Sequence, residues 1–264
     1  MLDIDVGVTG IAKLSDTYYI CYEDANQIHT FHTSPPYPHV SKICIDCVSH
    51  GDLRDVVASP VNQRLYTSDI GNSCIWRIDV NIDSTYAVSK FTDVDGNPRR
   101  LSVSPSGRLS VIEMQRNNVL IFDADGSQAT TINTPNDLDH LHHAIEWHWG
   151  LLLISHGFGI FDKHRVCEIS MSDASILPIH SYGDMCGTGE GQLFRPFYLA
   201  VCHENNTVFV ADIENRRMVI LDADLKQMDI ISTGKFRPTS FLYDADSKNI
   251  FVADMAFGIK VIRQ

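Results

Sequence analysis

The sequence predicts an all-β protein, a six-bladed β-propeller with four antiparallel strands in each blade. Three observations predict it. Short runs rich in Val, Ile and Phe alternate with turn residues, the pattern recurs at intervals of 42 to 44 residues, and no stretch has useful helical periodicity. A repeat of about 40–50 residues with four strands is typical of a propeller, whose blades surround a central channel. Six copies fill the 264 residues, so we expect one domain, residues 1–264.

The clearest copy of the repeat spans Gly187–Asp222. A glycine-rich approach, residues 187–191, leads to an apolar run at Tyr198–Val201. A second run, Val208–Asp212, is separated from a third, Met218–Leu221, by a polar turn. Runs of β-branched and aromatic residues bounded by Gly, Pro and Asn favour short antiparallel strands. Three such strands cannot bury both of their faces alone, so the unit must pack against copies of itself.

Matching copies lie on both sides of this stretch. Asp69 and Glu113, which end two of the second runs, are 44 residues apart, and Asp212 and Asp254 are 42 apart. The predicted blades cover about 10–50, 54–96, 100–136 and 142–185, followed by the copies at Gly187 and Arg237. The interval from His156 to Asp212 is 56 residues, which predicts an insertion in the fourth blade or its exit loop.

The motif in residues 187–217 also carries a family resemblance. It reads Gly-x-Gly-x-Gly-Gln, then Phe-Arg-Pro, then Val-x-Val-Ala-Asp-x-x-Asn-x-Arg. On this motif the chain resembles the NHL-repeat family of six-bladed β-propellers over nearly its whole length. The resemblance implies the fold, whereas function has to be argued from individual sites.

The two ends of the chain are expected to meet in one blade. The last copy, ending at Ile259–Arg263, supplies only three strands, and Met1–Val6 alternates apolar and acidic residues as a half-buried strand does. We therefore expect residues 2–6 to form the missing outer strand. This closure leaves no large sheet edge open.

Composition narrows the function. The net charge is −12 and the pI is near 5.3, which disfavours general nucleic-acid binding, because Lys and Arg supply most of that affinity. No run approaches the 18 apolar residues of a membrane span, and the N-terminal residues lack the pattern of a signal peptide. Seven cysteines form no regular framework. We expect a reduced, cytoplasmic, monomeric domain.

A charge pattern recurs in four copies. A basic residue opens the first strand and an acid closes the second, and these two positions are neighbours in an antiparallel blade. The pairs are Arg54 with Asp69, Arg100 with Glu113, Arg195 with Asp212, and Arg237 with Asp254. One interpretation is structural, since Arg matches a carboxylate with two hydrogen bonds. The other is that the arginines gather at the top mouth of the channel, with Tyr198 nearby, and bind a carboxylate, a phosphate or an acidic peptide tail.

The first and fourth copies break this pattern, and they lie opposite each other in a six-membered ring. The first has Thr9 and Tyr22 at these positions, and the fourth has His142, His143 and His156. A departure from a repeat's structural rule is where function is expected. Neutral imidazole binds zinc or copper, although a further ligand would be needed. Histidines that are hydrogen-bonded or exposed to solvent are the simpler interpretation.

The amidating lyases that act on peptidyl-hydroxyglycine are a related propeller family. They hold zinc in the channel with histidines from several blades. This chain is similar only in its fourth-blade histidines, because the other blades carry Arg or Thr there. Cys44-x-x-Cys47 supplies only half of a structural zinc site, and the glycines at 187–191 precede a strand rather than a helix.

These observations favour a binding propeller that recognises a protein, a peptide or a small anionic ligand at the top face. The candidate binding residues are the four arginines, Tyr22, Tyr198 and the three histidines named above. We expect no cofactor. The alternatives are a metal-assisted lyase or hydrolase with zinc or copper on His142, His143 and His156, and an RNA-binding NHL domain.

Overall fold

The computed structural model describes residues 7–23, 25–45, 51–127, 129–135, 137–172 and 178–263. These residues form 23 strands in six separate sheets and contain no helix. It follows that no helix in the described ranges is able to cross a membrane. Five sheets have four antiparallel strands, and the sheet at the C-terminus has three described strands.

The strands of the first three blades follow one another along the chain. Blade one contains β1 (Val8–Leu14), β2 (Thr17–Tyr22), β3 (Gln27–His32) and β4 (His39–Cys44). Blade two contains β5 (Leu53–Ser59), β6 (Arg64–Asp69), β7 (Cys74–Val80) and β8 (Tyr86–Asp93). Blade three contains β9 (Pro98–Val103), β10 (Leu109–Glu113), β11 (Asn118–Phe122) and β12 (Ala129–Asn133).

The last three blades have the same order. Blade four contains β13 (Leu141–His148), β14 (Leu151–His156), β15 (Lys163–Ser170) and β16 (His180–Met185). Blade five contains β17 (Pro196–Cys202), β18 (Thr207–Asp212), β19 (Arg217–Leu221) and β20 (Gln227–Ser232). Blade six contains β21 (Ser240–Asp244), β22 (Asn249–Asp254) and β23 (Gly258–Arg263).

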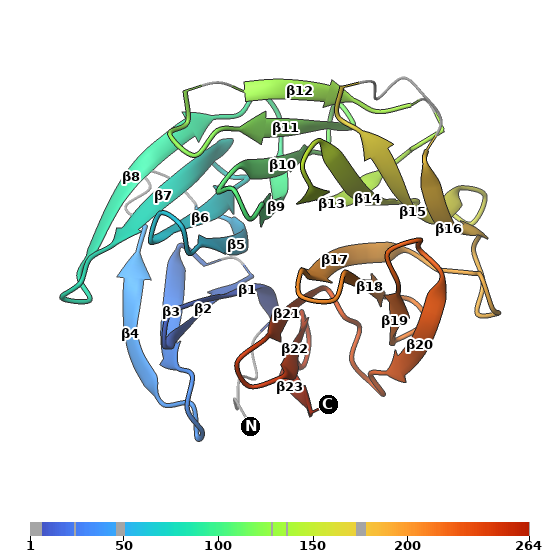
Figure 1. Cartoon of the computed structure of the whole chain (residues 1–264). Coiled ribbons are helices and arrows are strands. Elements are labelled where there is room, and N and C mark those ends of the chain that lie inside the picture. Colours follow the sequence, from blue (N-terminus) through green and yellow to red (C-terminus); the bar gives the residue numbers. More distant parts are fainter. Residues whose placement is uncertain are drawn as a thin grey trace.

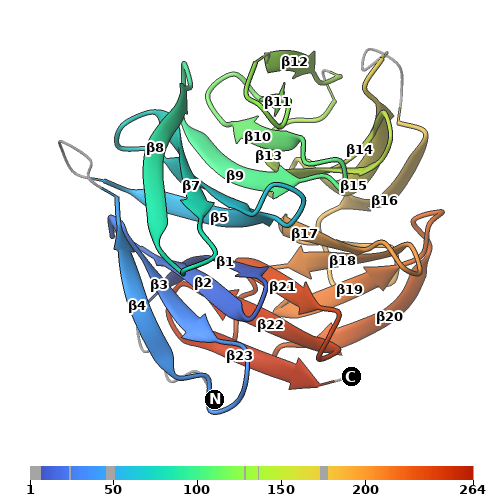
Figure 2. The same cartoon turned by 60° about the vertical axis from the view of Figure 1, so that its left-hand side comes forward.

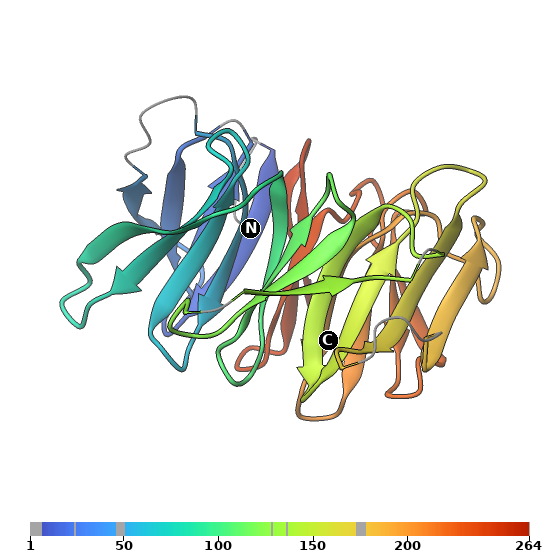
Figure 3. The same ribbon diagram turned by 90° about the horizontal axis from the view of Figure 1, so that it is seen from above.

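The six blades close into a ring around a central channel (Figure 1 and Figure 2). The first strand of each blade is innermost, and these strands contact one another in the order β1, β5, β9, β13, β17, β21 and back to β1. The predicted six-bladed β-propeller is therefore confirmed, and blades one and four lie opposite each other. Seen from above the view of Figure 1, the strands run between two opposite faces (Figure 3). We call the face at which the inner strands begin the top face.

The hydrophobic core lies between neighbouring blades. Tyr18 and Ile20 of β2, for example, pack with Phe251 and Ala253 of β22. The second strand of each blade is covered on both faces, so every residue of β18 is buried, whereas outer strands such as β20 are largely exposed. This burial explains why the second strands read as nearly continuous apolar runs in the sequence.

The acid that ends the second strand ties together the backbone of the top face. The Asp254 carboxylate accepts the backbone N–H groups of Arg237 at 2.5 Å, Ala256 at 2.6 Å and Phe257 at 3.0 Å. Asp212 accepts the N–H of Phe194 at 2.6 Å in the same way. A buried carboxylate that accepts several N–H groups fixes the turn and the start of the inner strand at once.

The predicted Arg–acid pairs within blades are wrong. Arg54 instead pairs with Asp52 and Glu23, as the salt bridges at 2.7 and 3.4 Å show. Arg195 and Arg237 both pair with Glu214, at 3.0 and 2.9 Å.

Neither Arg100 nor Glu113 forms the predicted pair, since Glu113 faces Arg116 at 3.6 Å. The physical reason is that Asp69, Asp212 and Asp254 already accept backbone N–H groups below the surface. Arg54, Arg195 and Arg237 pair instead with carboxylates that lie outside the second strands or at their ends.

The predicted outer strand at residues 2–6 lies outside the described residues, as does Cys47 of the Cys-x-x-Cys pair. The adjoining Gly7 packs against blade six, so closely that a Cβ there would lie 2.2 Å from the Met255 carbonyl oxygen. Ring closure by this segment stays a prediction. In blade four, the turn at residues 157–162 between β14 and β15 has six residues, against four at 213–216 in blade five.

We expect Asp254→Ala to lower the free energy of unfolding by about 2–4 kcal/mol, because three backbone N–H groups at the top face lose a buried acceptor. Urea denaturation followed by circular dichroism measures the change. The matched control is Asp224→Ala, an exposed carboxylate that pairs with Lys226 and whose loss should leave stability nearly unchanged, because water screens this ion pair. Equal effects of the two variants would contradict the capping role.

Candidate functional site at the top of the channel

A β-bulge near the start of the inner strand shapes the top of the channel in blades one to five. It inserts one residue opposite the second strand, between Leu53 and Asp55 in blade two for instance. By register, each blade then places two consecutive residues at equivalent positions. The outer position, which we call the rim layer, holds Thr9, Arg54, Arg99, His142, Phe197 and Thr239. The inner position, the channel layer, holds Gly10, Asp55, Arg100, His143, Tyr198 and Ser240.

Asp55 and Arg100 link blades one, two and three within the channel layer. Both side chains are buried. Asp55 accepts the N–H groups of Val56 at 3.0 Å and Leu101 at 3.1 Å. Arg100 Nη1 donates to the carbonyl oxygen of Thr9 at 2.7 Å and to that of Arg54 at 3.2 Å. Burial raises the pKa of Asp55 to about 7, although the positive charge of Arg100 opposes this shift.

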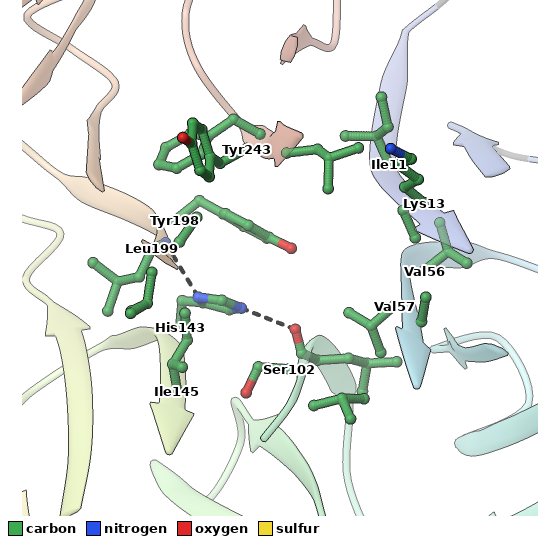
Figure 4. A pocket seen from close by; sticks show the side chains of 18 residues that line it. Ile11, Lys13, Val56, Val57, Ser102, His143, Ile145, Tyr198, Leu199 and Tyr243 are labelled. Carbon is green, nitrogen blue, oxygen red and sulfur yellow. Dashed lines mark hydrogen bonds between the residues drawn. The ribbon is translucent and has the colours of Figure 1, made fainter. Parts of the chain in front are cut away.

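His143 links blades three, four and five (Figure 4). Its Nδ1 accepts the backbone N–H of Leu199 at 3.1 Å, so Nε2 carries the proton and donates to the Leu101 carbonyl at 2.9 Å. The ring stacks on Tyr198 with centroids 4.1 Å apart and an interplanar angle of 16°. Burial lowers the pKa of His143 to about 3. The histidine is thus a neutral bridge between strand edges with no free nitrogen.

The other two histidines are also engaged. His142 Nε2 hydrogen-bonds the Gly157 carbonyl at 3.0 Å, and His156 Nε2 accepts from Arg165 Nε at 3.3 Å. Burial lowers the pKa of each histidine to about 3. Within the described ranges, no three His, Cys, Asp or Glu side chains are grouped to hold a metal ion. His142, His143 and His156 therefore do not fit the zinc or copper site that the sequence suggested.

Four arginines gather on the rim above the channel layer. We call Arg54, Arg99, Arg195 and Arg237 the arginine cluster. Arg99 differs from the other three, because no carboxylate of the described chain forms an ion pair with it. Its guanidinium lies 5.9 Å from the centre of the Phe197 ring. Burial, together with the charges of Arg100, Arg54 and Arg195, lowers the pKa of Arg99 to about 10.

Arg99 is the residue that sequence reasoning missed. Arg99 and Arg100 are adjacent, and only the bulge in β9 decides that Arg100 turns into the channel layer while Arg99 takes the rim position of Arg54. Arg100 is buried and held by carbonyl groups, so its predicted place in a solvent-accessible binding site does not match its position. The sequence did contain one indication of this, because Arg99 is a second basic residue directly before the expected Arg100.

The two predicted tyrosines lie in different environments. Tyr198 is in the channel layer beside Arg100, whose guanidinium carbon is 5.6 Å from the ring centre. Tyr22 packs in the core between blades one and six with Val8 and Phe251, and burial raises its pKa to about 12. The structure therefore brings Tyr198 to the channel and places Tyr22 in the interblade core.

A cavity of about 200 Å³ lies inside the channel, next to the channel layer (Figure 4). Its wall is mainly apolar, with Val56, Leu101 and Phe241 among the lining residues, and the Tyr198 hydroxyl points into it. Lys13 also lines it but pairs with Asp244 at 2.5 Å. Because both nitrogens of His143 are engaged, no free general base lies beside a nucleophile among the described residues that line the cavity.

Comparison with known proteins supports the propeller fold and assigns no activity. No protein-family model and no curated protein matches the chain. Among solved structures, a streptogramin B lyase is 12% identical with a TM-score of 0.67, covering 100% of this chain and 85% of that one. Virginiamycin B lyase from Staphylococcus aureus is 13% identical with a TM-score of 0.66, covering 99% and 86%. A chain of a nidogen/laminin complex is 15% identical with a TM-score of 0.62, covering 85% and 80%.

The buried histidines make stability depend on pH. Their pKa values are about 3 in the folded protein and near 6.5 when unfolded, so the unfolded chain binds more protons below pH 6.5. The stability present above pH 6.5 is lost as pH falls toward 3. Asp55, with its raised pKa, has the opposite effect between pH 3.8 and 7. Near pH 5 the unfolded chain therefore binds about two more protons than the folded protein, three at the histidines less one at Asp55. This difference predicts that the free energy of unfolding falls by about 3 kcal/mol for each unit by which the pH is lowered.

Urea denaturation between pH 7 and pH 4.5 measures this slope. His143→Gln should reduce the slope by about 1.4 kcal/mol per pH unit, because one proton no longer separates the two states. His148→Gln replaces an exposed histidine and is the matched control. A slope that is the same in wild type and His143→Gln would show that His143 does not stay neutral in the folded chain.

Proposed function

We propose that this protein is a binding propeller whose arginine cluster recognises an anionic group on a protein, a peptide or a small ligand. The observation that carries the proposal is Arg99, a half-buried guanidinium without an ion-pair partner among the described residues, close enough to Arg54 and Arg195 to feel their charges. A cation crowded by other cations in a poorly hydrated place is stabilised by an incoming anion. The planar guanidinium fork suits carboxylate and phosphate groups equally well.

The charge distribution supports the same proposal. The chain as a whole carries −12, yet the cluster adds four guanidinium groups above a fifth, Arg100. The carboxylates that pair with the cluster are Glu23, Asp52 and Glu214, and one of them serves two arginines. The top of the channel is therefore a local positive site on an acidic protein. An anionic group is attracted to this site, whereas the acidic remainder of the protein surface repels it.

The alternatives have less support. Two similar structures are lyases by name, but His142 and His143 are already hydrogen-bonded to backbone carbonyl groups here. RNA binding would need a broader basic surface than four arginines on a chain with a charge of −12. The NHL-type motif, which runs from the loop before β17 to the first residue of β19, supports assignment to that propeller family. A monomeric, cytoplasmic protein remains our expectation.

We expect Arg99→Ala to weaken the binding of an acetylated tetraglutamate peptide by about tenfold, equivalent to about 1.4 kcal/mol. Arg195→Ala should have a similar effect, whereas Arg237→Ala should have a smaller one, because its side chain is 54% exposed. Isothermal titration calorimetry at low ionic strength measures the affinity, which should fall as salt is added.

Arg263→Ala, an exposed arginine at the end of β23 away from the top face, is the matched control and should bind as wild type does. Pyrophosphate, titrated in parallel, tests whether the site prefers carboxylate or phosphate. Wild-type affinity in both Arg99→Ala and Arg195→Ala would rule out the arginine cluster as the binding site.

A further inference from the structure

An apolar loop stands on the top face beside the arginine cluster. It joins β14 to β15 and has the sequence Gly-Phe-Gly-Ile-Phe-Asp, residues 157–162. Phe158 is 52% exposed, Ile160 59% and Phe161 86%. Single exposed apolar residues are ordinary, but three within four positions of one turn form a patch.

Polar contacts of Asp162, His164 and Cys186 hold the loop in place. Asp162 Oδ2 accepts the N–H groups of Phe158 at 3.1 Å and Gly159 at 2.7 Å. His164 Nδ1 accepts the N–H of Arg195 at 2.8 Å, so its Nε2 carries the proton and donates to the Gly159 carbonyl at 2.8 Å. The Cys186 thiol donates to the Ile160 carbonyl at 3.4 Å. The apolar side chains are thus presented to solvent on a fixed backbone.

The loop and the arginine cluster form one continuous surface. The Arg195 guanidinium lies 3.7 Å from the centre of the Phe158 ring. The centres of the His142 and Phe158 rings are 6.4 Å apart. His142 Nε2 is hydrogen-bonded to the Gly157 carbonyl at the start of the loop. A partner bound to Arg195 would therefore meet Phe158 directly, and Ile160 and Phe161 are exposed in the same turn.

We infer that the natural partner is a peptide segment in which a carboxylate stands next to an aliphatic or aromatic side chain. The arginine cluster takes the carboxylate, and the loop with Phe158, Ile160 and Phe161 takes the apolar group. Rigid, exposed aromatic side chains beside an arginine are the usual make-up of an interface hot spot, because little conformational entropy is lost on binding. This inference rests on the proposed function of the arginine cluster.

A lipid surface fits the same patch less well. The face that carries the loop also carries the carboxylates of Glu214, Asp162 and Asp137, and the whole chain is strongly acidic. Repulsion from anionic headgroups opposes insertion of the loop, whereas a short acidic peptide reaches the arginines without bringing a charged plane against the carboxylates.

A selection from displayed random short peptides tests the inference. We expect enriched sequences to place Asp or Glu within a few positions of Leu, Ile, Phe or Trp. A synthetic copy of the most enriched peptide is then titrated by fluorescence anisotropy. The double variant I160S/F161S should weaken its binding about tenfold or more, since both side chains are exposed and neither supports the loop's hydrogen bonds.

Two further variants make the outcome specific. Ile82→Ser replaces a fully exposed isoleucine in the β7–β8 turn and should bind as wild type does. Arg99→Ala should also weaken binding about tenfold. If Arg99→Ala loses affinity but I160S/F161S does not, the apolar half of the inference is wrong while the anion site stands.

If neither variant loses affinity, both proposals fail. No enrichment of acidic–apolar peptides contradicts the inference, and so does loop-dependent binding to phosphatidylglycerol vesicles with no peptide binding. Thermal unfolding of each variant verifies that the fold is retained.

Discussion

The inner strand of each blade has an unpaired edge that faces the channel. The backbone N–H and C=O groups on these edges need hydrogen-bond partners, and this need determines which side chains line the top of the channel. The N–H of Leu101 on β9 is accepted by Asp55, and its carbonyl is bound by His143. The N–H of Leu199 on β17 is accepted by the same histidine, and the Ser102 hydroxyl donates to the Ala144 carbonyl on β13. Because buried backbone groups need partners, side chains from the next blade replace the ladder that a continuous sheet would have supplied.

Because of this constraint, the side chains of the channel layer and of the rim layer have different surroundings. The channel layer contains an acid, a guanidinium, an imidazole and a phenol, a set that resembles a catalytic site in composition. Hydrogen bonds already occupy Asp55, Arg100 and His143, so the layer acts as a cross-brace between blades. The rim layer differs, because Arg99 has no acid partner there in the described chain. Outside that layer, the Arg195 guanidinium lies over the Phe158 ring.

Some of the site was readable from the sequence and some was not. The recurring acid was correctly placed at the end of the second strand, and blades one and four were correctly identified as exceptions lying opposite each other. The partner of that acid could not be predicted, because every residue except proline has a backbone N–H and the sequence does not show which of them the carboxylate binds. Asp254 accepts three N–H groups, and Arg237 pairs with Glu214 instead. The histidines of blade four were recognised as unusual, but their hydrogen bonds to carbonyl groups of other segments depend on ring closure.

By itself the sequence determined the class of fold, the number of blades and the four strands in each of the first five blades. These follow from local patterns, the alternation of apolar runs with turns and the interval between acids, which act over a few residues and recur. Only the tertiary structure decided that Arg99 rather than Arg100 reaches the surface, and that a loop of blade four lies against an arginine of blade five. A one-residue bulge reverses the direction of a side chain, and contacts between blades join residues far apart in the chain, so neither is encoded in any local pattern.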